Sequence, residues 1–453
     1  MRRMQKHAAT LVTMNDFSGG LNVMSEGDLI APNEMQACQN FWFTGYQRSL
    51  TPRGGLTDPI ATFGADIMGT YYDIDSNTFL VFLEGGAIYR YEAAGTAPDS
   101  IGFLTGTRRP VCAKFMDRIW IASGGKLQFY DFSRADSIST ILNGPVCDLV
   151  FQRFSRLCAV LTGHDRVQLS AIGDGEAWEE DTDDASRGAW IDVGYGDSGD
   201  IVAVAPLATD LILIKSNGMI YQLAGDHDVD SWAVYRVATE TDPLGRNAAI
   251  PVGNDVVFVS RQGLKTLHTT MDYGNIAQGD IGEKWNALVT DGLYDPQLFH
   301  LRRRKNLLVR PTGDKRHILA YNYAVGAATT LLFPVPVVSV EETMDRVIVA
   351  AGKNLYALDE ARLSDGEGVP IPYEIQARDI TSNDRILVRA VDTDFAAPQA
   401  GEVAVTVGAV RLRMPANTRR KVRCNHSARR LETRLASMTP FQPKRISLEV
   451  ADL

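Results

Sequence analysis

The stretch FLVFLEGGAIYRY (79–91) contains an apolar run, a turn at Gly86 and a second run with aromatic side chains. Val, Ile, Leu, Phe and Tyr suit a pleated strand, and glycine supplies the positive φ that a tight turn requires. The stretch therefore predicts a β-hairpin. An isolated hairpin is only marginally stable in water, so this one needs neighbours that cover its faces.

The same pattern recurs along the chain. Clear copies are RIWIASGGKLQFY (118–130), DLILIKSNGMIYQL (210–223), DVVFVSRQGLKTL (255–267) and RVIVAAGKNLYAL (346–358), and weaker copies lie at 156–170 and 306–321. The other turn glycines, spaced 38 to 55 residues apart, are Gly125, Gly163, Gly218, Gly263, Gly313 and Gly352. This period leaves room for about two further strands in each copy and is typical of β-propeller blades.

We therefore predict an all-β fold, with a β-propeller of six or seven blades over residues 61–369. An irregular arm with a short helix is expected at 1–60. At 370–453 we expect a small antiparallel β-module or, alternatively, strands that close the propeller ring and extend past it. A pair of β-sandwiches is the alternative, although sandwiches have no reason to keep this period. The aromatic residues of the arm that we expect to be buried against the propeller or a neighbouring copy are Phe17, Phe41, Trp42 and Phe43.

Signals for other elements are weaker. The stretch 28–40 suggests a short helix capped near Asn33, and 268–289 suggests another near its end. Alternating apolar residues predict further strands at 372–380, 384–395, 402–414 and 445–450. In the arm, Gly19 and Gly20 predict a turn that a side chain would obstruct.

The composition of the 453 residues, 45% hydrophobic and 22% charged, is typical of a globular protein. The longest apolar stretch, 201–214, is shorter than the ~18 residues of a membrane helix and contains Asp210, so no membrane-spanning segment is expected. The five cysteines show no CxxC pair. They predict reduced thiols in a chain made in a cytosol.

Charge is distributed unevenly along the chain. Residues 411–453 carry a net charge of +8 and the remaining residues −17, and 173–184 contain seven acidic residues. A basic end on an acidic body can bind an acidic partner surface, a neighbouring copy or phosphate, although a merely solvated surface is the alternative. The candidate interface residues are Arg411, Arg413, Arg419, Arg420, Lys421, Arg423, Asp181, Asp183 and Asp184.

Motifs that would carry chemistry are incomplete. GDSGD (196–200) resembles a serine-protease nucleophile segment, but no histidine has the expected surroundings, so a turn is predicted. SAIGDGEAW (170–178) resembles the Asp box of sialidases, itself a structural turn, with Ile172 at the aspartate position. DHDVD (226–230) lacks the rest of a calcium loop. We expect no catalytic residue, no cofactor and no metal, and no enzyme activity.

The N-terminal residues resemble the opening segment of a known protein family. NDFSGGLN (15–22) is followed by an acidic spacer, LIAPNEMQACQNFWF (29–43) and LTPRGGL (50–56). This order resembles the opening of bacteriophage tail hub or nozzle proteins, also called packaged-DNA stabilisation proteins. The matching residues are Phe17, Gly19, Gly20, Leu21, Asn22, Pro32, Asn33, Glu34, Asn40, Phe41, Arg53 and Gly54. A segment found early in the family's propeller is similar to Ser170, Gly173, Asp174 and Trp178.

The resemblance implies a structural protein of the virion tail, made in the host cytoplasm. Family members form a ring of identical subunits, six in number, that extends the portal–adaptor channel. Such a ring helps to retain the packaged DNA that passes through it and anchors fibres or spikes. The basic end would then meet an acidic surface on an adjacent copy or a tail partner; the rival placement is the channel wall, against DNA phosphates.

Two other functions remain open at this point. The first is a carbohydrate-active, sialidase-like propeller enzyme, which would need Arg, Asp and Tyr side chains to converge in a pocket on one face of the propeller. The second is a cellular propeller that serves as a scaffold.

Overall fold

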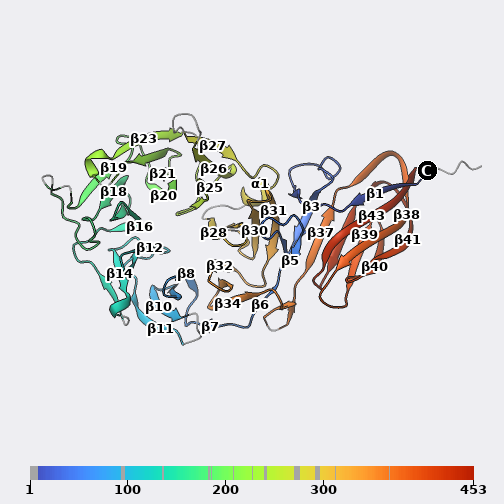
Figure 1. Ribbon diagram of the computed structural model, residues 1–453, viewed down its shortest axis with the longest axis horizontal. Coiled ribbons are helices and arrows are strands. Elements are labelled where there is room, and N and C mark those ends of the chain that lie inside the picture. Colours follow the sequence, from blue (N-terminus) through green and yellow to red (C-terminus); the bar gives the residue numbers. More distant parts are fainter. Residues whose placement is uncertain are drawn as a thin grey trace, which may run out of the picture.

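The computed structural model describes residues 9–452 except 93–96, 135–136, 182–183, 185, 208, 227, 239–241, 270–275, 291–295, 312 and 367. Over these residues the chain forms a seven-bladed β-propeller with a β-sandwich beside it (Figure 1). Each blade is an antiparallel sheet that is four strands deep, and the first strand of each blade lies nearest the central channel. These first strands contact one another around the ring, as β12 with β16 and β28 with β32.

The strands of the first six blades follow one another in sequence. Blades 1 to 3 are β8 (Ile67–Asp73), β9 (Thr78–Leu83), β10 (Ala87–Glu92) and β11 (Asp99–Phe103); β12 (Val111–Phe115), β13 (Arg118–Ala122), β14 (Gln128–Asp131) and β15 (Ile138–Thr140); and β16 (Cys147–Arg153), β17 (Arg156–Leu161), β18 (Arg166–Leu169) and β19 (Ala189–Asp192). Blades 4 to 6 are β20 (Ile201–Leu207), β21 (Asp210–Lys215), β22 (Ile220–Ala224) and β23 (Ala233–Ala238); β24 (Ala249–Val252), β25 (Asp255–Ser260), β26 (Gly263–Thr269) and β27 (Ile276–Asp280); and β28 (Gln297–Leu301), β29 (Asn306–Arg310), β30 (His317–Asn322) and β31 (Ala327–Leu332).

The seventh blade closes the ring with strands from both ends of the propeller sequence. β32 (Val337–Glu342), β33 (Val347–Ala351) and β34 (Asn354–Asp359) come from its C-terminal end. The N-terminal strands β6 (Gly55–Leu56) and β7 (Ala61–Thr62) both pair with β34 and form the outermost layer. The ring is therefore held shut by main-chain hydrogen bonds between residues about 300 positions apart.

The predicted turn glycines confirm the repeat. Six of the seven lie in the connection between the second and third strands of their blade, and Gly263 is the first residue of the third strand of blade 5. Gly86 and Gly352 have φ values of 88° and 54°, the left-handed region that glycine occupies without strain. In blade 2 the neighbouring Gly124, rather than Gly125, has the positive φ, of 81°. The all-β propeller prediction is thus confirmed, with seven blades.

The C-terminal strands form two sheets whose buried residues share one hydrophobic core. The first sheet continues blade 6 through β3 (Glu34–Gln39) into β37 (Tyr373–Ala377), β42 (Thr433–Ser437), β39 (Glu402–Val407) and β40 (Val410–Pro415). The second has the order β1 (Thr10–Met14), β43 (Gln442–Asp452), β38 (Ile380–Ala396) and β41 (Arg420–Leu431). The N-terminal segment thus contributes a strand to each sheet. The remaining short strands are β2 (Gly20–Leu21), β4 (Phe41–Trp42), β5 (Thr51–Pro52), β35 (Ser364–Asp365) and β36 (Val369–Pro370).

The helix expected within 28–40 is wrong, because this segment carries β3. β3 pairs with β37 on one side and with β2 and β31 on the other, and such long-range pairing outweighs a local helix signal. Within the described residues the helices are α1 (Asn286–Thr290) and the 3-10 turns η1 (Phe132–Arg134) and η2 (Val229–Ser231). None of the described helices has the length and apolar character that crossing a membrane would require.

Candidate functional site

The basic residues singled out in the sequence lie along one edge of the sandwich. β40 and β41 are consecutive in the chain and are the edge strands of the two sheets, so their outer main-chain groups are unpaired by strand neighbours. All six predicted residues, Arg411, Arg413, Arg419, Arg420, Lys421 and Arg423, are exposed on these strands or in their connection. We call residues 410–431 the basic edge. Edge strands bearing positive charge resist non-specific pairing but can accept an acidic partner.

Three of the six basic residues already form ion pairs within the chain. Arg419 donates from Nε and Nη2 to the Asp392 carboxylate at 3.2 and 2.7 Å, and Arg445 Nη2 donates to the same carboxylate at 3.0 Å. The hydrogen bonds from Arg419 hold the pKa of Asp392 below its usual value. Arg413 pairs with Glu402 of the adjacent strand β39, and Lys421 pairs with Glu449 of β43, so both of these residues already have a partner within the sandwich.

The other three basic residues are available to a partner. Arg411, Arg420 and Arg423 form no ion pair within the described part of the chain, and all are exposed. A partner would not have to break an existing pair to reach them. They are therefore the residues of the basic edge best placed for an intermolecular contact.

The predicted acidic residues lie far from the basic edge. Asp181 and Asp184 are exposed in the connection between β18 and β19 of blade 3, and Asp183 lies outside the described residues. Figure 1 places β18 and β19 at one end of the long axis and β40 and β41 at the other. The two candidate surfaces are thus not brought together within one chain, but their positions allow a head-to-tail contact between copies.

The Ser170–Trp178 segment forms a structural turn of blade 3. Trp178 is buried and donates from its indole nitrogen to the Gly175 carbonyl at 2.8 Å, while Ala171 N donates to Ala177 O at 2.8 Å. The buried Arg156 side chain donates to the Ser170 carbonyl at 2.6 Å. This confirms that the sequence resembling an Asp box is a turn held by its own main chain.

The other two motifs also serve local structure. In GDSGD, the Asp197 carboxylate accepts hydrogen bonds from the buried Lys215 and from Tyr221. In DHDVD, the Asp226 and Asp228 carboxylates accept from nearby main-chain nitrogens, while His227 lies outside the described residues. Over the part of the chain that is described, His, Cys, Asp and Glu side chains form no group of three or more suited to a metal ion.

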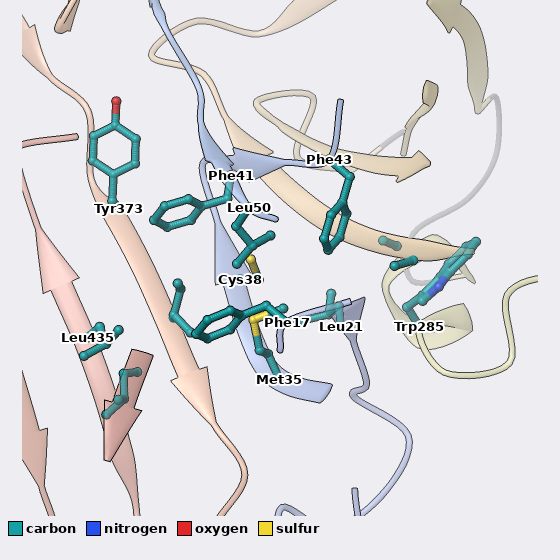
Figure 2. Packing of buried hydrophobic residues seen from close by; sticks show 14 of the residues in the cluster. Phe17, Leu21, Met35, Cys38, Phe41, Phe43, Leu50, Trp285, Tyr373 and Leu435 are labelled. Atoms are coloured by element: carbon teal, nitrogen blue, oxygen red, sulfur yellow. The ribbon is translucent and has the colours of Figure 1, made fainter. Parts of the chain in front are cut away.

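The residues that resemble the tail hub opening build a joint between propeller and sandwich, which sequence reasoning did not anticipate. Figure 2 shows Phe17, Leu21, Phe41 and Phe43 packed in one cluster between Trp285 of the propeller side and the sandwich residues Tyr373 and Leu435. The four expected aromatic residues, Trp42 included, are at most 3% exposed. The expected burial of these aromatic residues is therefore confirmed, and the segment consists of short strands joined by irregular stretches that pack into the core.

Glycines of this segment are required by close contacts. A Cβ at Gly19 would lie 2.7 Å from the Asn33 carbonyl oxygen. Gly20 has φ +67°, and a Cβ there would lie 2.8 Å from the Ala327 side chain of blade 6. The predicted obstruction is therefore confirmed; it comes from the N-terminal segment itself at Gly19 and from blade 6 at Gly20.

Buried polar residues fix the joint in place. Asn22 and the Ala31 main-chain nitrogen each donate to Glu34 Oε2 at 2.8 Å, and Lys284 lies 2.6 Å from Oε1. Burial alone would raise the pKa of Glu34, but these hydrogen bonds outweigh it and lower the pKa. Asn40 is fully buried; it donates to the Pro372 carbonyl at 2.7 Å and accepts from Leu332 N at 2.7 Å.

Arg53 forms the central ion pair of the joint. Its guanidinium donates to both carboxylate oxygens of Asp365, at 2.8 and 2.7 Å, and to the Leu332 carbonyl at 3.0 Å. The Arg53 side chain is 0% exposed and that of Asp365 3% exposed. Tyr373 donates to the Arg53 carbonyl at 2.7 Å. One buried arginine thus links the N-terminal segment, blade 6 and the start of the sandwich.

A cavity of about 1010 Å³ occupies the central channel of the propeller. Inner strands of five blades contribute to its wall, namely β8, β12, β24, β28 and β32. We call it the channel cavity. Its charged and aromatic lining residues are Arg108, Arg109, Arg246, Arg302, Arg303, Glu341, Glu342, Tyr71, Tyr72, Phe299 and His300. Sequence reasoning missed this site because its residues come from separate blades and form no local motif.

No family model and no curated protein match the sequence. Solved structures that match at low identity include β-propellers. BamB from Moraxella catarrhalis has 11% identity and a TM-score of 0.42, covering 64% of this chain and 82% of that one. The WD40 propeller domain of Doa1 has 11% identity and a TM-score of 0.47, covering 70% and 97%. The propeller domain of Myceliophthora thermophila Cps50 (Swd1) has 8% identity and a TM-score of 0.46, covering 68% and 100%.

Proposed function

We propose that this chain is a structural subunit of a bacteriophage tail hub or nozzle, assembled head to tail into a ring of six around a channel for DNA. The observation that supports this most is the joint. The residues that resemble the family's opening, among them Phe17, Gly20, Asn40 and Arg53, are the residues that fix the sandwich to the propeller. The resemblance therefore concerns the architecture of the chain as well as its first 56 residues.

The distribution of charge supports a head-to-tail contact. The basic edge lies at one end of the long axis, and the acidic connection of blade 3 lies at the other (Figure 1). A contact between unlike surfaces produces a closed ring when its rotation divides a full turn. We propose that Arg411, Arg420 and Arg423 of one copy meet Asp181 and Asp184 of the next, and that the ring number six follows the family.

In the proposed ring, the packaged DNA passes through the channel between subunits. The portal–adaptor proteins would lie above the ring, and fibres or spikes would attach to its outer face. Partners of this kind need an exposed, rigid scaffold, and a propeller whose core is closed by main-chain pairing in its seventh blade offers one. The rival placement of the basic edge, against DNA phosphates on the channel wall, predicts the same salt sensitivity but a different response to charge reversal.

Two measurements test the proposed function. Portal, adaptor and terminase genes should flank the gene for this chain. Electron microscopy of the purified chain should show closed rings, with a mass six times 49.7 kDa. A gene set without virion components, together with a chain that stays monomeric at every concentration tested, would contradict the proposal.

A carbohydrate-active propeller is the second candidate, and one observation favours it. The channel cavity brings several arginines together with Tyr71 and Tyr72, although no aspartate is among its lining residues. Such an enzyme would hydrolyse aryl glycosides of acidic sugars. We expect no turnover; turnover that is lost in a Tyr71→Phe variant would favour the enzyme over the tail subunit.

A further inference from the structure

The channel cavity has a charge opposite to that of the body around it. Five arginines and two glutamates line it, a net charge of +3, whereas the chain outside residues 411–453 has a net charge of −17. A cavity with low-dielectric walls concentrates the field of the charges that line it. The cavity therefore attracts anions although the body around it repels them.

The arginines reach the cavity from three separate connections. Arg108 and Arg109 precede β12, Arg246 precedes β24, and Arg302 and Arg303 follow β28. They thus converge from blades 2, 5 and 6. A guanidinium presents its donors in a planar fork that matches two oxygens of a phosphate or a carboxylate. Several guanidinium groups around one cavity suit a ligand with more than one oxyanion group.

The contacts of these arginines make the site rigid and leave capacity for a ligand. Arg246 donates to the Arg109 carbonyl at 2.6 Å and also to the Asp148 carbonyl, which fixes the connection that carries Arg109. Arg108 pairs with Asp148. Arg302 is exposed and, among the described residues, forms no ion pair. A ligand could therefore engage Arg302 without displacing an existing partner.

The size and the remaining lining residues fit a small molecule. A volume of about 1010 Å³ lies at the upper end of the range of about 300–1,000 Å³ that is usual for small-molecule sites. The rings of Tyr71, Tyr72 and Phe299 supply apolar surface beside the arginines. Arg109 lies over the Phe299 ring, 6.0 Å from its centroid.

Glu341 makes anion binding dependent on pH. Burial raises the pKa of Glu341 to about 7, and the groups that face it are Thr70, Arg109, Tyr71 and Cys112. Burial also raises the pKa values of Tyr71 and Cys112, and burial with nearby Arg302 and Lys305 lowers the pKa of His300 to about 4, so these groups stay neutral from pH 5 to 8. Glu341 is thus the group of this wall that changes its charge in that range.

We propose that the channel cavity binds a small molecule carrying two or more oxyanion groups, phosphate or carboxylate, between Arg109, Arg302 and Arg303. This site is independent of the proposed tail function, since it lies inside each propeller and away from the basic edge. Glu341 weakens binding more at pH 8 than at pH 6, because a protonated Glu341 no longer repels the ligand.

Isothermal titration of the full chain with pyrophosphate and with citrate tests the proposal. At least one of the two should bind at pH 6 with a Kd below about 1 mM. Arg302→Gln should weaken binding about tenfold, the loss expected for one charge-assisted contact of about 1.4 kcal/mol. At pH 8, Glu341→Gln should bind the anion more tightly than the parent does, and at pH 6 this difference should be smaller. Stronger binding of pyrophosphate points to a phosphate ligand, and stronger binding of citrate to a carboxylate ligand.

Arg420→Gln is the matched control, because it removes an exposed arginine of the basic edge and should leave binding unchanged. Thermal melting confirms that each variant is folded. The proposal is overturned if neither anion binds at about 10 mM, far above the Kd predicted for the site. It is also overturned if Arg302→Gln binds as the parent does while Arg420→Gln binds weakly, since the anions would then bind at the basic edge.

Discussion

The blades are stabilised mainly by contacts between residues close in sequence, whereas the joint is stabilised by contacts between residues far apart in sequence. Within each of the first six blades, each strand pairs with the next one in sequence, as β21 pairs with β22 through the short turn at Gly218. In the joint, Arg53 pairs with Asp365 and Asn40 with Pro372, more than 300 residues apart. The same strand pairing recurs from blade to blade, whereas the contacts of the joint occur at one place in the molecule. Damage to a blade should therefore remain more local than damage to the joint, which ties both ends of the chain together.

The largest effect is expected for the central ion pair of the joint. Arg53→Met removes one partner of a buried pair and leaves the Asp365 carboxylate without its main donors, which typically costs about 3–5 kcal/mol. Urea denaturation followed by fluorescence measures this loss of unfolding free energy. Arg420→Met, an exposed control on β41, should change stability by less than about 0.5 kcal/mol. Equal effects of the two substitutions would show that Arg53 does not hold the joint.

A glycine of the joint should tolerate substitution less well than a glycine of a blade turn. Gly20 and Gly352 both have positive φ, but a Cβ at Gly20 meets Ala327 at 2.8 Å, whereas a Cβ at Gly352 has nothing within 4 Å. Gly352→Ala should cost about 1 kcal/mol from the backbone conformation alone. Gly20→Ala should cost about 1–3 kcal/mol more, as strain and overpacking are added. Thermal unfolding of the two variants checks the order, and the reverse order would contradict this account of the joint.

The smallest effect concerns the channel. The pKa of Glu341 is raised from 4.5 to about 7 in the folded protein, so folding binds a proton and stability falls as the pH rises from about 4.5 to about 7. Glu341→Gln should therefore raise the melting temperature at pH 8 and leave it unchanged near pH 4. Differential scanning calorimetry at both pH values measures the difference. A variant less stable than the parent at pH 8 would mean that the charged Glu341 stabilises the channel.

The range of the contacts also explains what could be predicted from the sequence. The turn glycines indicated the propeller because each marks a hairpin closed within about 20 residues, and such a signal repeats. For the joint, the sequence showed only a motif. Gly20 and Arg53 match a family pattern, but the residues they contact, Ala327 and Asp365, are not near them in sequence. The helix prediction for 28–40 is wrong for the same reason, since the strands that pair with β3 lie elsewhere in the chain.

For the candidate site too, local properties could be predicted from the sequence and long-range contacts could not. The net charge of residues 411–453 identified the basic end, because charge is counted without knowledge of the fold. Which arginines form ion pairs depends on their strand neighbours. Arg419 pairs with Asp392 of β38, whereas Arg420 of β41 forms no ion pair with any of the described residues. The residues that line the channel cavity come from five blades, so no single segment of the sequence contains a motif for it.

The head-to-tail ring is tested most directly by exchanging charge between its two surfaces. One variant carries Arg411→Glu, Arg420→Glu and Arg423→Glu, and the other carries Asp181→Lys and Asp184→Lys. Each variant alone should fail to form rings in electron microscopy, because like charges then meet at every contact. An equimolar mixture should form rings again, since the two variants alternate and each contact joins opposite charges. Rings from either variant alone, or a mixture that stays monomeric while the parent chain forms rings, would contradict the proposed contact.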